Sequence, residues 1–253
     1  MQNFFQRGPS RGPGMGFPGA GRQPNLTYAL IAINVVMLVA MEVAGGSTDT
    51  GVLVDFGAMY GPKIAEGDYW RLFTAMFLHV GVVHLLLNAF NLFIFGRMVE
   101  EVFGPFRFAL LYVLAGLFGS VTSYLVNPDV IAAGASGAVF GIIGMMMAYL
   151  AVQRLVLGKE AQQTLYGLLV FAGVLLGYGL LNSGIDNWAH LGGLAAGFGL
   201  GYALTPEYDV VRSITGRPMG MTERAGEQAK RLWVVGLAIL VLVLGVWAGN
   251  VSL

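Results

Sequence analysis

Apolar residues in this 253-residue chain gather in long runs that short polar segments separate. An α-helix rises 1.5 Å per residue, so about 20 apolar residues cross the roughly 30 Å hydrocarbon layer of a bilayer. Seven runs reach or approach that length. They cover residues 26–44, 80–95, 106–126, 134–152, 164–181, 188–204 and 232–248. The pattern predicts an all-α polytopic membrane bundle, with six helices followed by a seventh at the C-terminus.

The segments outside these runs differ in character. Residues 1–25 are rich in Gly, Pro and Arg and have no apolar period, so we expect a flexible tail and no signal peptide. Segment 45–79 is too long for a simple turn, and its aromatic and apolar residues predict an interfacial structure on the membrane surface. Segment 205–231 is expected to be a polar loop. Residues 232–253 would form the seventh helix and a short tail.

Composition agrees with a membrane protein. Apolar residues make up 56% of the chain and charged residues 11%, whereas soluble domains carry about 25% charged residues. The absence of cysteine excludes disulfides, thiolate metal sites and cysteine nucleophiles. A net charge of zero gives no indication of a nucleic-acid partner.

Basic residues orient the predicted bundle. If the N-terminus is cytoplasmic, the inner segments hold twelve of the 14 Lys and Arg residues, and only Lys63 and Arg71 lie outside. Because cytoplasmic segments of membrane proteins are enriched in Lys and Arg, we expect the N-terminus inside and the C-terminus outside. The short tails, without a serine-rich transit peptide, favour a prokaryotic plasma membrane.

Polar side chains within the spans are the candidates for function, because each costs free energy in a bilayer unless it is paired or used. They are His79 just before the second span, then His84, Asn88, Ser136 and His190, with Asp186 at the edge of a span. In the expected topology, spans two, four and six run in the same direction. The side chains of His84, Asn88, Ser136 and His190 then lie at their outer ends, at one depth. A single site would require such a shared depth.

Local spacing suggests how these groups would act. Asn88 follows His84 by four residues, a rotation of about 40° on a helix, so both point the same way. Ser136 lies between Gly134 and Gly137, which leave room for a substrate carbonyl, and its amide would lie at the positive end of a helix. A hydroxyl, an imidazole and amide donors are the groups that acyl transfer needs.

Each residue alone has a simpler structural explanation. Ser136 could be a packing residue, because Gly137 with Gly141 and Gly193 with Gly197 fit close helix contacts. A histidine near the end of a span is often an interfacial hydrogen-bonding group, and an asparagine in a span often links two helices. The shared depth favours one site over these separate explanations.

Other proteolytic chemistries fit the same residues poorly. His79 and His84 are five residues apart with no glutamate between them, unlike a zinc-protease helix. Asp186 has no second acid as a partner, and no lysine falls within a span. A serine–histidine pair without metal or cofactor remains. Asp186 could face His190, but a loop role before the helix is simpler, so we expect a dyad.

Taken together, these residues resemble the rhomboid protease family over about residues 26–204. The resemblance is carried by Trp70-Arg71, by His79, His84 and Asn88, by Gly134-Ala135-Ser136-Gly137, and by Ala189-His190 with Gly193 and Gly197. It implies a rhomboid-like six-helix core, and the seventh run places the chain with the six-plus-one type. It also implies that Trp70 and Arg71 are structural.

The resemblance assigns a role to each site residue. Ser136 would be the nucleophile and His190 the general base, while His84 and Asn88 would form the oxyanion hole with the Ser136 amide. Gly193 and Gly197 would let the sixth helix pack closely on the fourth. Phe140 stands where some members carry a tyrosine, and its ring is expected to stack on the base.

The implied function is an intramembrane serine endopeptidase that hydrolyses peptide bonds in or near transmembrane segments of membrane proteins. The alternative is a catalytically inert rhomboid-like binder of transmembrane clients. A channel or transporter is disfavoured, because its polar residues would follow a path across the bundle rather than gather at one depth.

Overall fold

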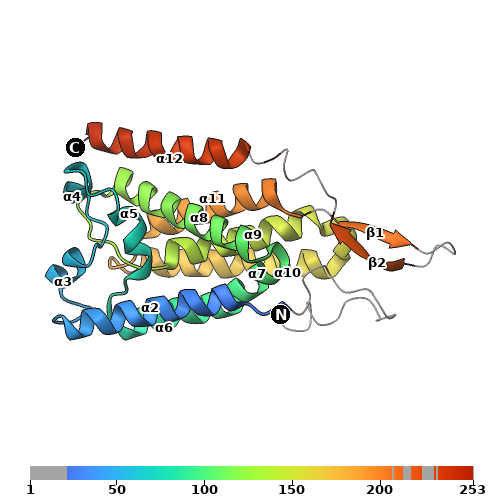
Figure 1. The fold of residues 1–253 in the computed structure, drawn as a ribbon, viewed down its shortest axis with the longest axis horizontal. Coiled ribbons are helices and arrows are strands. Elements are labelled where there is room, and N and C mark those ends of the chain that lie inside the picture. The colour runs from blue at the N-terminus through green and yellow to red at the C-terminus, as the bar shows by residue number, and fades with distance from the viewer. Residues whose placement is uncertain (1–21, 207, 213–217, 224–230, 232, 253) are drawn as a thin grey trace.

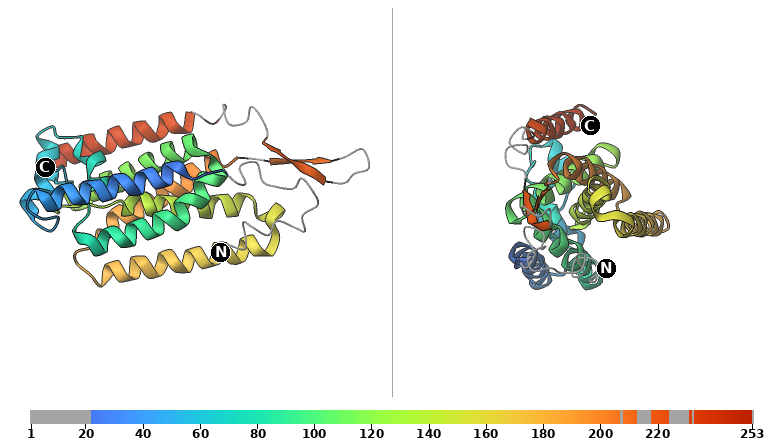
Figure 2. Two further views of the ribbon diagram at one scale, coloured as in Figure 1. Left: turned by 60° about the horizontal axis from the view of Figure 1, so that its bottom comes forward. Right: turned by 90° about the vertical axis from the view of Figure 1, so that its right-hand side faces the viewer.

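The computed structural model describes residues 22–206, 208–212, 218–223, 231 and 233–252 of the chain. Each run expected to cross the membrane contains a helix, and the helices lie side by side along one direction (Figures 1 and 2). They are α2 (Asn25–Val43), α6 (Gly81–Asn91) continued by η2 (Leu92–Gly96) and α7 (Arg97–Phe103), α8 (Pro105–Val126), α9 (Ser136–Val152), α10 (Arg154–Leu180), α11 (Asn187–Leu204) and α12 (Trp233–Ser252). The predicted bundle of membrane helices is confirmed.

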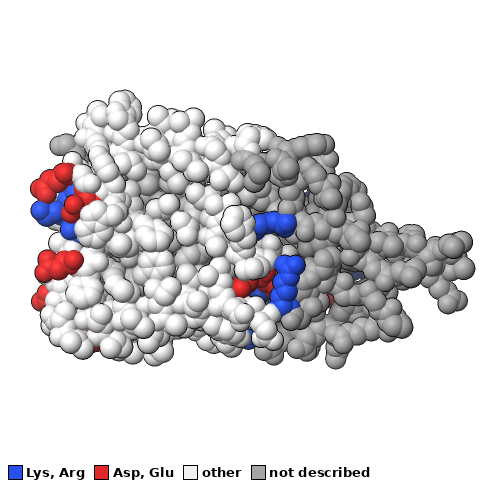
Figure 3. Space-filling view, viewed as in Figure 1, with Lys and Arg blue, Asp and Glu red and all other residues white. Residues whose placement is uncertain are grey.

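Five of the described helical stretches are long and apolar enough to cross a bilayer, and α9 is a shorter apolar helix of 17 residues. On the face drawn in Figure 3, the charged side chains gather near the two ends, and an uncharged band lies between them. Large apolar side chains on the outer helices are exposed, among them Val83 at 71% and Val170 at 67%. This is an integral multi-pass membrane protein.

Two spans are longer than their apolar runs. The second continues from Gly81 through a π-helical turn to Phe103, and the fifth helix starts at Arg154 and kinks at Gly158, where φ is 69°. The hydropathy pattern predicted too short a helix in both cases, because charged residues follow the apolar run in the second span and precede it in the fifth. Residues such as Lys159 and Glu160 favour helix in spite of their charge.

Segment 45–79 forms four short helices at one end of the bundle, which we call the loop end (Figure 1). They are α3 (Thr50–Asp55), α4 (Gly61–Ala65), α5 (Arg71–Thr74) and the 3₁₀ helix η1 (Ala75–Phe77). The buried Arg71 side chain donates hydrogen bonds to the carbonyl oxygens of Val54 and Ala58 and to the Asp68 carboxylate. Its guanidinium also lies 4.7 Å from the centre of the Trp70 ring. Trp70 and Arg71 therefore hold this segment together.

The opposite end carries an antiparallel β-hairpin that the sequence did not predict, and we call it the hairpin end (Figure 2). Strands β1 (Tyr208–Arg212) and β2 (Pro218–Glu223) lie where a polar loop was expected. Their alternation is too short and too polar to stand out from a loop, although β-branched residues such as Val210 favour strands. The expectation for the N-terminal tail falls mainly on residues 1–21, which lie outside the described part of the chain.

Glycines bring α9 and α11 into close contact at the centre of the bundle. Nearly every residue of α9 after Ser136 is buried. A Cβ atom on Gly193 would collide with the backbone of Gly137, and one on Gly197 with the backbone of Gly141. The two backbones thus touch one turn after another, which fixes the first turns of α9 and α11 relative to each other.

Candidate active site

Ser136 is the first residue of α9, directly after a turn that is tied to the loop end. The Gly134 amide donates to the Ala75 carbonyl at 2.9 Å. Gly134 has a φ of +149°, and a Cβ atom there would lie 2.8 Å from Cε1 of His84, so both the conformation and the space require glycine. This turn presents Ser136 at the positive end of the α9 dipole.

His190 lies in the first turn of α11 and meets Ser136 across the bundle. Its Nε2 atom is 2.9 Å from Oγ of Ser136, although the two residues are 54 positions apart in sequence. The His190 side chain is buried, at 8% exposure. At this distance a hydroxyl can give its proton to an imidazole nitrogen.

Phe140 follows Ser136 by one turn of α9, and its ring lies against the imidazole. The ring centroids of Phe140 and His190 are 4.3 Å apart and the planes differ by 17°, a stacked arrangement. Nδ1 of His190 has no hydrogen-bond partner in the part of the chain that the structure describes. Stacking and helix position, rather than a third polar group, hold the ring.

His84 and Asn88 lie on one face of α6, but they reach the turn differently. Nδ1 of His84 accepts the Val80 amide at 3.3 Å, and a Cβ atom on Gly134 would lie 3.0 Å from His84 Nε2 and 3.6 Å from Ser136 Oγ. His84 therefore borders the serine turn. The Asn88 amide instead donates to the His84 backbone carbonyl at 3.0 Å. One of its two N–H groups remains for another acceptor.

His79 contacts this turn and the His84 ring. Its side chain is fully buried, its Nε2 accepts the Ala135 amide at 3.5 Å, and its ring lies edge-on to His84 at 5.3 Å. Burial, and to a lesser degree the neighbouring His84, lower the pKa of His79 to about 3, so it is neutral at pH 7. Sequence reasoning gave His79 no separate role.

Comparison with known proteins identifies the fold that carries this arrangement. Residues 66–207 match the family model described as the Rhomboid domain, and this range includes every candidate site residue. The chain belongs to the rhomboid family. Some of its relatives are named rhomboid proteases.

Three relatives show the extent of the similarity. Rhomboid protease GluP of Bacillus subtilis (strain 168) is 40% identical over 176 residues, which are 70% of this rhomboid chain and 34% of the relative. The putative rhomboid protease YdcA of the same organism is 38% identical over 144 residues, 56% of this chain and 71% of the relative. RHOMBOID-like protein 4 of Arabidopsis thaliana is 38% identical over 204 residues, 79% and 50% of the two chains. The chain thus spans about a third of the length of GluP and about half of the length of RHOMBOID-like protein 4.

Asp186 caps the rhomboid helix that carries His190. One carboxylate oxygen accepts the Ala189 amide at 3.0 Å, and the other accepts the Ser123 hydroxyl of α8 at 2.5 Å. No hydrogen bond joins this carboxylate to the His190 side chain among the described contacts. Sequence reasoning considered Asp186 for the loop before the helix but missed Ser123. A serine near the end of the predicted third span was the available signal.

Proposed function

We propose that this rhomboid protein is an intramembrane serine endopeptidase in which Ser136 is the nucleophile and His190 the general base. The observation that carries the proposal is the 2.9 Å approach of His190 Nε2 to Ser136 Oγ at the first turns of two helices. Close packing of α9 on α11 does not require this contact between residues 54 positions apart, because the glycines already bring the two helices together.

The reaction follows from these positions. His190 accepts the Ser136 proton at Nε2 while Oγ attacks the peptide carbonyl, and it then gives the proton to the leaving amine. A water molecule hydrolyses the acyl-enzyme by the reverse steps. Nε2 must start unprotonated, so the proton of the neutral ring is on Nδ1, and the stacked Phe140 ring keeps the imidazole plane in line with the serine.

Charge on the carbonyl oxygen would be stabilised beside the same turn. The Ser136 amide lies at the N-terminus of α9, and His84 borders Gly134. Asn88 has a second N–H to donate while the first stays on the His84 carbonyl. Donors fixed in place before the reaction typically supply one of the larger contributions to rate.

The substrate would be a transmembrane protein in the bilayer. A peptide must be extended to be cut, so small or helix-breaking residues near the scissile bond should favour cleavage. With the N-terminus cytoplasmic, the loop end faces the outer side of a prokaryotic plasma membrane. Water would then reach Ser136 from that side without crossing the bilayer.

Cleavage in proteoliposomes tests this function. Wild-type protein should hydrolyse a fluorogenic transmembrane peptide, and Ser136→Ala should lower kcat by at least about a thousandfold. Ser120→Ala, a serine of α8 outside the site, is the matched control and should keep full activity. Equal cleavage by the wild type and Ser136→Ala would refute the assignment. Tight peptide binding without any cleavage would favour the inert binder.

A further inference from the structure

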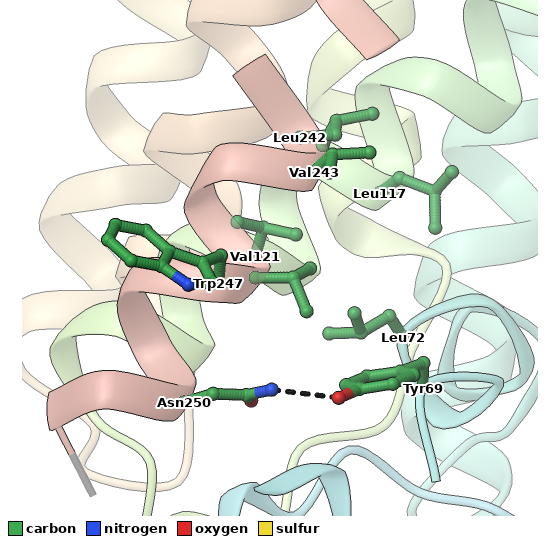
Figure 4. A pocket seen from close by; sticks show the side chains of 9 residues that line it. Tyr69, Leu72, Leu117, Val121, Leu242, Val243, Trp247 and Asn250 are labelled. Atoms are coloured by element: carbon green, nitrogen blue, oxygen red, sulfur yellow. Dashed lines mark hydrogen bonds between the residues drawn. The ribbon is translucent and has the colours of Figure 1, made fainter. Parts of the chain in front are cut away.

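A pocket of about 450 Å³ lies between α12, α8 and the start of α5, away from the candidate active site (Figure 4). The residues that line it are Tyr69, Leu72, Leu117, Val121, Leu242, Val243, Val246, Trp247 and Asn250. None of them belongs to the serine–histidine site. Its volume falls within the range of about 300–1,000 Å³ that is typical of ligand sites.

The pocket is apolar along most of its length and continuous with the membrane-facing surface. Its lining on α12 follows one helical stripe, and two members of that stripe, Val243 and Trp247, are 59% and 65% exposed. Leu117 and Val121 of α8 form the opposite wall. Such walls exclude water and accept hydrocarbon.

Close contacts beside the pocket explain why the gap persists. A Cβ atom on Gly245 would lie 2.7 Å from the Val121 side chain, and Gly249 lies against the Tyr124 ring. These glycines bring α12 close to α8 on one side of the pocket. Leu72 lines the other side. An empty space of this size would lose the dispersion contacts of all its lining atoms. In a bilayer the nearest material able to fill it is an acyl chain.

The hydrogen-bonded polar groups that line the pocket, on Tyr69 and Asn250, lie at its loop end. The Asn250 side chain donates to the Tyr69 hydroxyl at 2.8 Å (Figure 4). It also accepts the Tyr124 hydroxyl at 2.7 Å. The Tyr69 oxygen is thus an acceptor, and no hydrogen bond among the described residues uses its own proton. Tyrosine is enriched at the level where the ester carbonyls of lipids lie, and such a carbonyl has acceptors but no donor.

We propose that this pocket binds one acyl chain of a glycerophospholipid from the leaflet at the loop end, with the lipid ester carbonyl accepting the Tyr69 proton. The site goes beyond the proposed protease function and does not rest on it. Because Tyr69 and Leu72 flank the buried Arg71, the bound lipid joins the seventh helix to the segment that Arg71 holds together.

Photolabelling of the full chain in nanodiscs tests the proposal. The nanodiscs contain a trace of phosphatidylcholine with a diazirine on one acyl chain, and fragmentation mass spectrometry locates the adducts. We expect adducts on Val121, Val246 and their neighbours in the pocket. Val246→Phe fills the space, and exclusion of two methylene groups corresponds to about a tenfold loss of labelling there. Tyr69→Phe removes the donor and should lower labelling about fivefold.

Val241→Phe is the matched control, since Val241 is 46% exposed on the same helix and does not line the pocket. It should leave labelling of Val121 unchanged. Leu117→Phe fills the pocket from α8 and replaces Val246→Phe if that variant fails to fold. Equal labelling of Val121 in the wild type and both filling variants would overturn the proposal. So would displacement of the adducts by an added transmembrane peptide, which would show a protein occupant instead.

Discussion

Ser123 of α8 donates a hydrogen bond of 2.5 Å to Asp186, the residue that caps the helix carrying His190. The carboxylate therefore ties the first turn of α11 to a neighbouring helix. Because His190 has no hydrogen-bond partner at Nδ1 within the described residues, its position depends on this turn and on the Phe140 ring.

Substitutions at Asp186 should separate capping from charge. Asp186→Asn keeps a cap on the Ala189 amide, whereas Asp186→Ala removes it and costs about 1 kcal/mol of stability. If the cap positions His190, kcat should fall by about tenfold in Asp186→Ala and much less in Asp186→Asn, with KM unchanged in both. Equal kcat losses in the two variants would instead point to the carboxylate charge.

Added volume between α9 and α11 should separate Ser136 from His190. Gly193→Ala places a Cβ atom against the Gly137 backbone, which cannot move without shifting α9. We expect a loss of about 1–3 kcal/mol in stability and a large fall in cleavage. Thermal unfolding in detergent and peptide cleavage would measure the two effects.

Gly199→Ala provides the control on the same helix, because nothing lies within 4 Å of a Cβ atom built there. Alanine favours helix over glycine by up to about 1 kcal/mol, so this variant should be as stable as the wild type or more so. Equal damage by both substitutions would show that helix propensity, and not the contact with Gly137, governs this region.

The Phe140 ring should contribute to activity through the stacking of its face on the His190 imidazole. Phe140→Tyr keeps the stacking on His190 and should retain activity within about twofold, whereas Phe140→Leu loses an interaction worth about 1 kcal/mol and should lower kcat about fivefold. Steady-state kinetics on one peptide substrate would measure both. Full activity in Phe140→Leu would contradict a role for the stacked ring.

Stability should fall with pH below the ordinary histidine range because of His79. Its pKa is about 3 in the fold and 6.5 when unfolded, so the unfolded chain binds the extra proton between these values. Each pH unit within that window costs up to about 1.4 kcal/mol of stability on acidification, and none is lost above it. Unfolding followed from pH 7 to 4 should show a flatter dependence in His79→Gln. An unchanged slope would exclude His79 as its source.

Hydropathy predicted the helical stretches, but the second span was longer than its apolar run. Glu100 explains this difference. Its buried carboxylate accepts the amides of Leu26 and Thr27 and the Thr27 hydroxyl, so it closes the N-terminus of α2. Hydropathy counts such a carboxylate as polar and ends the span before it. It cannot show that the hydrogen-bond partners of the carboxylate come from another helix.

The candidate site shows the same limit. The expected topology placed Ser136, His190 and His84 at one end of parallel helices, and the structure brings their side chains to one turn. The hydrogen bond of Asn88 to its own helix and the Ser123–Asp186 contact could not be derived, since each depends on a side-chain rotamer. Spacing indicates which face a residue occupies, but not which partner it chooses.

A covalent adduct on Ser136 tests the account most directly. Purified full-length protein would be treated with a serine-directed fluorophosphonate, and the modified residue located by fragmentation mass spectrometry. The account predicts one adduct per chain on Ser136, at least about a hundredfold slower formation in His190→Ala, and none in Ser136→Ala. Folded wild-type protein that stays unmodified at Ser136, or reacts equally fast without His190, would contradict it.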